Sequence, residues 1–193
     1  PTSTEAVAHA VTQAGGCFLD APMTRTPREA AEGRLNLLVG GDADLLQECL
    51  PLLQCFAEHI THTGAAGSGH RMKLLHNYVS LGSVALIAEA AACALAAGVA
   101  PEVFVDVLAK GGGGGVALER LRPYLLAQDP GGLRFSMSNA LKDMGYYSAM
   151  ARDGEAAHGI AQAVHDSFAL AVADGGPQRL VPELVEIFKK KSR

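Results

Sequence analysis

The chain has 193 residues, of which 49% are hydrophobic and 19% are charged, and its formal net charge is −4. This length allows one large domain or one and a half small ones, and the apolar content is enough for a packed core. An acidic balance argues against a nucleic-acid-binding surface. The cysteines at 17, 49, 55 and 93 lack CxxC spacing and have apolar neighbours. We therefore expect buried free thiols and a reducing compartment, the cytoplasm.

The first third of the chain alternates between helix and strand patterns. We expect a helix over 3–14, strands over 17–20 and 34–41, a helix after Asp42, and a strand over 58–64. This α-β-β-α-β order indicates part of an α/β sheet, too short to be a complete one.

Beyond residue 64 the patterns predict helices and no convincing strand. The expected helices cover 68–98, 101–109, 115–128, 138–152, 155–174 and 181–191. The sequence therefore predicts a mainly α chain with a boundary between residues 66 and 67. Part of the first of these helices, 78–100, is apolar enough for a membrane span, but Glu89 and the many alanines favour a protein core, shared between subunits.

The stretch GSGHRMKLLHN, residues 67–77, places four basic side chains near the positive end of the long helix, where cations are unfavourable. Lys73 and Asn77 are four residues apart and share one helix face. The backbone N–H groups near Gly69 are suited to an anion, and the positive helix end favours a neutral, proton-accepting Lys73. An ordinary solvated helix start explains the same residues equally well.

The stretch FLDAPMTRTP, residues 18–27, places polar groups after a strand. Thr24 could hydrogen-bond a substrate carboxylate and Arg25 could pair with an anion. On this stretch alone, a polar turn in which Asp20 accepts from backbone amides is the better interpretation. Lys142, beside Asp143, is by default solvated helix surface.

Two other features remain open or are set aside. The glycines of KGGGGG, residues 110–115, form either a flexible loop or a loop that lets a ligand approach the backbone, and no GK[ST] follows for a phosphate loop. His59 and His62 lie three apart in a predicted strand and point to opposite faces, so we expect no metal site.

Together these stretches resemble the β-hydroxyacid dehydrogenases, which include 3-hydroxyisobutyrate dehydrogenase and tartronate semialdehyde reductase. DAPMT is similar to the family's substrate-binding segment DAPVSGG, GSGHRMKLLHN matches its catalytic motif GxGxxxKxxxN, and LKDMG resembles its later cofactor segment. The resemblance runs from residue 1 to about 175 and keeps the family's order.

The resemblance implies an N-terminal Rossmann domain for NAD or NADP, of which residues 1–66 are the last part, and an all-helical domain over 67–193 that forms a homodimer or homotetramer. It implies an oxidoreductase that moves a hydride between nicotinamide and a small β-hydroxy acid or its semialdehyde. Lys73 is then the general acid/base. Thr24, Arg25, Gly69 and Asn77 contact the substrate, and Lys142 contacts the cofactor.

The chain departs from the family pattern in two places. Arg25 and Thr26 replace two glycines, and no GxGxxG follows a strand, so the cofactor's main binding region is expected upstream of residue 1 and this piece is not expected to act alone. The alternative to an enzyme is a non-enzymatic helical oligomerisation module that has inherited the fold.

Overall fold

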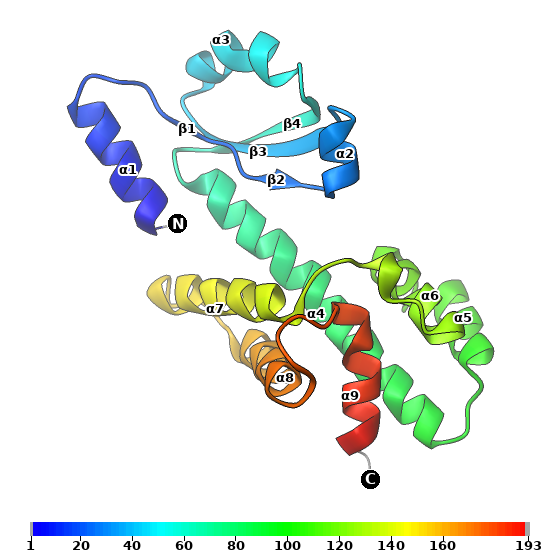
Figure 1. The fold of residues 1–193 in the computed structure, drawn as a ribbon. Helices are drawn as coiled ribbons and strands as arrows, with labels where there is room; N and C mark the ends of the chain where they lie inside the picture. Colours follow the sequence, from blue (N-terminus) through cyan, green and yellow to red (C-terminus); the bar gives the residue numbers. More distant parts are fainter. Residues whose placement is uncertain (1, 192–193) are drawn as a thin grey trace. The chain divides into compact units, whose positions relative to one another are not determined.

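The computed structural model describes residues 2–191, coloured along the chain in Figure 1. The chain divides into two compact units, one up to His76 and one from Asn77 onward. This division falls inside α4 (Ser68–Ala96), the longest helix. The domain boundary expected between residues 66 and 67 stays a prediction.

The first unit combines short helices with a small sheet. Its elements are α1 (Thr2–Gln13), β1 (Leu19–Asp20), β2 (Met23–Thr24), α2 (Pro27–Ala31), β3 (Leu35–Gly41), α3 (Ala43–Leu53), β4 (Ala57–Gly64) and the start of α4. The strands and helices predicted in this region are all present, with the first strand shortened to two residues. No periodic pattern in the sequence predicts β2 or α2, because elements of two and five residues are too short to show one.

Strand β3 is the centre of the sheet. β1 and β2 pair antiparallel with successive parts of it, with Leu19 opposite Gly41 and Met23 opposite Leu37, whereas β4 pairs with it in parallel. Helix α3 connects the two parallel strands, as in a βαβ unit. The alternating side chains of β3 and the inner face of α3 form the core, which centres on Leu37, Val39 and Leu46.

The second unit is helical. Besides most of α4 it contains α5 (Pro101–Lys110), α6 (Val116–Ala127), η1 (Pro130–Gly132), α7 (Met137–Asp153), α8 (Gly159–Gly175), η2 (Val181–Glu183) and α9 (Leu184–Lys191). The predicted mainly helical class is confirmed. The last predicted helix is divided, because Pro182 begins a short 3₁₀ turn before α9.

Small residues of α4 lie at the centre of the helical core. Val84 and Ala88 are fully buried, and Leu118 of α6 and Phe168 of α8 belong to the same cluster. Alanine allows neighbouring helices to approach closely, so α4 can be a central element without a bulky apolar face.

The prediction of buried cysteines is wrong. All four cysteines are free, but Cys17, Cys55 and Cys93 are exposed and Cys49 is half-buried. Cys17 and Cys55 lie in connecting turns, and Cys93 lies on the outer side of α4. Apolar neighbours in the sequence do not bury a side chain in a turn or on a helix face that the core does not cover.

The outer side of α4 is apolar and uncovered in the single chain. Val79 and Leu86 are 63% and 71% exposed, and with Cys93 they repeat every seven residues, which places them in one stripe. By length and composition alone α4 could also cross a membrane, and 33% of its most apolar window is buried. A core helix of a soluble protein meets the same criteria, so this observation alone decides nothing.

Candidate functional site

The buried carboxylate of Asp20 lies at the N-terminal end of α4. Its side chain has no exposed surface. It accepts hydrogen bonds from the backbone N–H of Gly67 at 2.7 Å and of His70 at 2.9 Å, and His70 Nδ1 lies 3.1 Å from the same carboxylate. The anion that satisfies this positive helix end is therefore a side chain of the protein itself.

Close packing explains the glycine at position 69. A Cβ atom there would lie 2.3 Å from the carbonyl oxygen of Leu38 and 2.7 Å from a carboxylate oxygen of Asp20. Gly40, at the end of β3, is equally confined, because a Cβ atom there would lie 2.8 Å from the backbone nitrogen of Gly69. The glycine is required for α4 to begin against β3, and a contact between Gly69 and substrate stays a prediction.

His70 and Arg71 at the start of α4 have acidic partners within the first unit. His70 contacts Asp20, and Arg71 forms an ion pair with Glu5 of α1. These pairs explain how α4 tolerates cations near its positive end. Lys73 is partly buried and lies on the same helix, one turn before Asn77.

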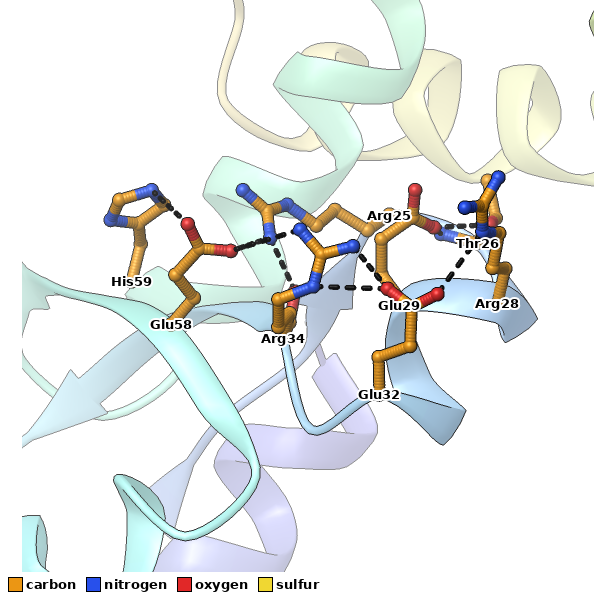
Figure 2. A network of polar contacts seen from close by, with 8 residues as sticks. All are labelled: Arg25, Thr26, Arg28, Glu29, Glu32, Arg34, Glu58 and His59. Carbon is orange, nitrogen blue, oxygen red and sulfur yellow. Dashed lines mark hydrogen bonds and ion pairs between the residues drawn. The ribbon is translucent and has the colours of Figure 1, made fainter.

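Arg25 belongs to a network of charged groups around β2, α2 and the starts of β3 and β4 (Figure 2). Its guanidinium donates to a carboxylate oxygen of Glu58 and to the carbonyl oxygen of Arg34. Figure 2 shows eight residues of this network: Arg25, Thr26, Arg28, Glu29, Glu32, Arg34, Glu58 and His59. Arg25 is therefore already paired with an internal anion, and an anionic ligand would have to compete with Glu58 for it.

The backbone of Arg25 has a φ of 79°, in the left-handed region that favours glycine. This is one of the two positions at which the related family motif carries glycine. The hydrogen bond from Arg25 holds the pKa of the Glu58 carboxyl below its ordinary value, with smaller contributions from other nearby cations. The side chain that replaces glycine is thus fixed by a specific ion pair.

Asn77 and Lys142 contact the same carboxylate in the second unit. Asn77 Nδ2 donates to Asp143 Oδ2 at 2.8 Å, and Lys142 Nζ lies 3.3 Å from Asp143 Oδ1. Asp143 is buried, whereas the Lys142 side chain is 51% exposed. Lys142 thus lies on the helix surface, as expected by default, whereas Asp143 beside it is buried because α7 directs this residue toward α4.

An aromatic contact lies beside this cluster. Tyr78 and Tyr147 stack with ring centroids 4.1 Å apart and an interplanar angle of 16°. Burial raises the pKa of the Tyr147 hydroxyl, so this tyrosine stays neutral at physiological pH. The stacked rings and the Asn77–Asp143 hydrogen bond both connect α4 to α7, which fixes the orientation of the Asn77 side chain.

The structure thus distributes the predicted site residues over the two units. The first unit contains Thr24, Arg25, Gly69 and Lys73, and Thr24 is buried in β2 opposite Asn36 of β3. The second unit contains Asn77 and Lys142. Their assembly into one site stays a prediction.

Asp143 is a residue that the sequence analysis missed, although the sequence contains a signal for it. The buried positions of α7 include Ala140, Met144, Tyr147 and Ala151, which follow a helical period. Asp143 belongs to that buried face. A carboxylate at a core position requires a hydrogen-bonding partner, which Asn77 supplies.

The glycine run and the histidines give no further site. A Cβ atom at Gly113 would lie 2.7 Å from the Leu108 side chain, whereas one at Gly112 would meet nothing within 4 Å. Both interpretations of this loop stay predictions. Within residues 2–191, no three His, Cys, Asp or Glu side chains gather as a metal site, and His62 contacts the carbonyl of Gly41 at 2.8 Å.

The first unit has an open α/β sheet with two parallel strands. In open α/β sheets ligands gather beyond the carboxyl ends of the parallel strands, which here are Gly41 of β3 and Gly64 of β4. Gly64 has a φ of 120°, and a Cβ atom there would lie 3.6 Å or more from its neighbours, so the backbone is open to a ligand. The phosphate-binding GxGxxG turn does not occur in these 193 residues.

Comparison with known proteins gives matches along nearly the whole chain. Residues 67–188 match the family described as the NAD-binding region of NADP-dependent 3-hydroxyisobutyrate dehydrogenase, and residues 1–64 match the NAD-binding domain of 6-phosphogluconate dehydrogenase. An uncharacterised oxidoreductase of Synechocystis sp. is 38% identical over 140 residues, which are 71% of this chain and 47% of that protein.

Two further matches are also dehydrogenases of hydroxy acids. An NAD-dependent L-serine dehydrogenase of Pseudomonas aeruginosa is 33% identical over 124 residues, which are 64% of this chain and 42% of that protein. The solved structure of Mycobacterium tuberculosis 3-hydroxyisobutyrate dehydrogenase with L-serine superimposes with a TM-score of 0.86 at 26% identity, and covers 96% of this chain and 65% of that one. The chain spans about half the length of the curated relatives it matches.

Proposed function

Because this chain belongs to the 3-hydroxyisobutyrate dehydrogenase-like β-hydroxyacid dehydrogenases, we propose that it is the C-terminal part of an NAD(P)-dependent oxidoreductase of small β-hydroxy acids or their semialdehydes. The observation that carries the proposal is the placement of Lys73 and Asn77 one turn apart on the continuous helix α4. Relatives named as dehydrogenases of L-serine, L-threonate and 3-hydroxyisobutyrate support the substrate class.

The residues of this chain bind the substrate and transfer its proton. Lys73 accepts the hydroxyl proton when the alcohol is oxidised and returns a proton to the carbonyl oxygen in the reverse direction. Asn77 orients the substrate oxygen through its amide, and Asp143 holds that amide in place. The Thr24 hydroxyl binds the substrate carboxylate, and Gly69 lets the substrate approach the start of α4.

The nicotinamide, when bound, accepts the hydride from the carbon that carries the hydroxyl. Gly41 and Gly64 are the residues of the first unit that would hold this cofactor, and Lys142 is the residue of the helical unit that would contact it. The GxGxxG turn that would bind the cofactor phosphates is not among these 193 residues. Either NAD or NADP is compatible with these residues.

The outer stripe of α4 supports a homodimer or homotetramer. Val79, Leu86 and Cys93 expose a continuous apolar line that a second copy of the helical unit would cover. A protein with paired α4 helices needs no membrane to cover this surface, so we place it in the cytoplasm.

The test is turnover of the Lys73→Ala variant in the protein that carries the complete dinucleotide-binding domain. Reduction of NAD⁺ and NADP⁺ is followed with a panel of β-hydroxy acids. Loss of the general base lowers kcat by about 10²–10⁴-fold. Lys189→Ala is the matched control, because Lys189 is an exposed lysine paired with Glu186 on α9. Near-full activity of Lys73→Ala would refute the role of this lysine, and a wild type without any turnover would favour the oligomerisation module.

A further inference from the structure

Arg120 of α6 is a partly buried cation that is hydrogen-bonded to a neutral side chain. Its Nη1 donates to the Ser80 hydroxyl of α4 at 2.8 Å. No carboxylate within residues 2–191 lies within ion-pair distance of Arg120, whereas Arg122, two residues later, is paired with Glu119. Arg120 is only partly buried, so its guanidinium can still donate to a bound anion, which would supply the missing opposite charge.

The position of Ser80 on α4 brings this cation near Asn77, a residue of the proposed reaction that lies in the same unit. Ser80 is three residues after Asn77, which is about 4.5 Å along the axis of α4 and about 60° around it. Lys73 is seven residues before Ser80 and lies within about 20° of it on the same helix. Helix α4 therefore presents Lys73, Asn77 and Ser80 on one side, and the Arg120 guanidinium is bound to the last of them.

We propose that Arg120 is a specificity-determining residue that binds an oxyanion on the carbon chain of the substrate. This inference rests on the function proposed above and extends it to the groups that select the substrate. A guanidinium suits this task, because its planar fork can donate two parallel hydrogen bonds to a carboxylate. Because Ser80 Oγ accepts from Arg120, its own O–H remains able to donate to the same anion.

The oxyanion is either the carboxylate of the β-hydroxy acid, in which case Arg120 takes the role given above to Thr24, or a second acidic group farther along the chain. In a β-hydroxy acid one carbon separates the hydroxyl-bearing carbon from the carboxyl carbon. An anion site about one helical turn beyond Asn77 therefore suits the carboxylate of a substrate whose hydroxyl oxygen is oriented by Asn77. A longer diacid would place its far acid group at Arg120 and leave the near carboxylate to Thr24. Both candidate groups are carboxylates, which Arg120 can bind in the same way.

The test compares substrates in the Arg120→Met variant of the protein with its complete dinucleotide-binding domain. The substrates are a β-hydroxy acid, its methyl ester and a hydroxy diacid. Arg120→Met should raise KM so that kcat/KM for the anionic substrate falls about 10- to 100-fold, with little change for the ester. Arg120→Lys should lie between the two, because it keeps the charge but loses the fork.

The pattern among the substrates identifies the anion. If kcat/KM falls for both the monoacid and the diacid, Arg120 binds the substrate carboxylate. If kcat/KM falls for the diacid alone, Arg120 binds the second acid group. Arg122→Met is the control, because Arg122 is a neighbouring arginine of α6 with its own acidic partner. Arg122→Met should leave kcat/KM unchanged for all three substrates.

A purely structural role for Arg120 would give a different result. A structural role predicts an equal decrease in kcat/KM for the acid and the ester, together with a lower Tm. That outcome would overturn the inference, and so would an unchanged kcat/KM for every substrate. If Arg120→Met does not fold, Arg120→Gln and Ser80→Ala give the same comparison. A wild type inactive on every hydroxy acid with both cofactors would instead refute the proposed function itself.

Discussion

Replacement of Asp20 by alanine should destabilise the first unit far more than loss of an ordinary helix cap. The Asp20 carboxylate has no exposed surface and accepts three hydrogen bonds, two of them from the backbone N–H groups of Gly67, just before α4, and of His70, in its first turn. Hydrogen bonds to charged groups contribute about 1.5–3 kcal/mol each, but their losses are not additive. We expect Asp20→Ala to lower the free energy of unfolding by about 3–5 kcal/mol, as for breaking a buried charge contact.

This loss corresponds to a decrease in Tm of about 6–20 °C for a chain of this size. The assay is thermal and denaturant unfolding followed by circular dichroism, together with hydrogen exchange at the Gly67 and His70 amides. Asp42→Ala is the matched control, because Asp42 is an exposed cap of α3 with a single 2.9 Å hydrogen bond to the Leu45 amide. It should cost only about 1 kcal/mol.

The reasoning is refuted if Asp20→Ala destabilises no more than Asp42→Ala while the two amides remain protected. Asp20→Asn separates charge from shape in the same experiment. The amide keeps one acceptor and places an N–H group against the N–H donors of α4, so the variant should lose much of the stability despite its unchanged volume. A wild-type Tm for Asp20→Asn would show that the carboxylate charge is unimportant.

Two further predictions concern packing and pH. Gly69→Ala should cost at least about 1–3 kcal/mol in unfolding experiments, because the new methyl group would meet the backbone of β3, whereas Gly112→Ala, in open space, should not destabilise the protein. The depressed pKa of Glu58 stabilises the folded state above the ordinary value of 4.5, and this contribution is lost as the pH falls through the folded pKa. Acid titration of stability should therefore be less steep in Arg25→Met than in the wild type over this range, and identical titration curves would contradict the role of the ion pair.

Periodic patterns predicted the longer elements well, and local chemistry decided the rest. The alternating β3 and the amphipathic α3 were predicted because each buries one face. β2 and α2 were not, although Thr26, Pro27 and Glu29 form a capping signature from which the start of α2 could have been predicted. A cap and proline mark a helix start, but they give no length.

The candidate site was predictable only in its residue types. Lys73 and Asn77 were predicted from their spacing, whereas the contacts of Asn77 and of Ser80 join residues that are far apart in the sequence. Asn77 and Asp143 are 66 residues apart, and Ser80 and Arg120 are 40 apart. Nothing in a single sequence pairs such residues, because contacts of this kind depend on how the helices pack.

The left-handed backbone at residue 25 has an evolutionary consequence. Any side chain other than glycine is strained there by about 1–2 kcal/mol, and the Arg25–Glu58 pair helps to offset that strain. Arginine at this position is therefore expected only where an acidic residue at position 58 can pair with it and offset the backbone strain. Across homologues the two positions should change together, with glycine at the first wherever the acid is missing from the second.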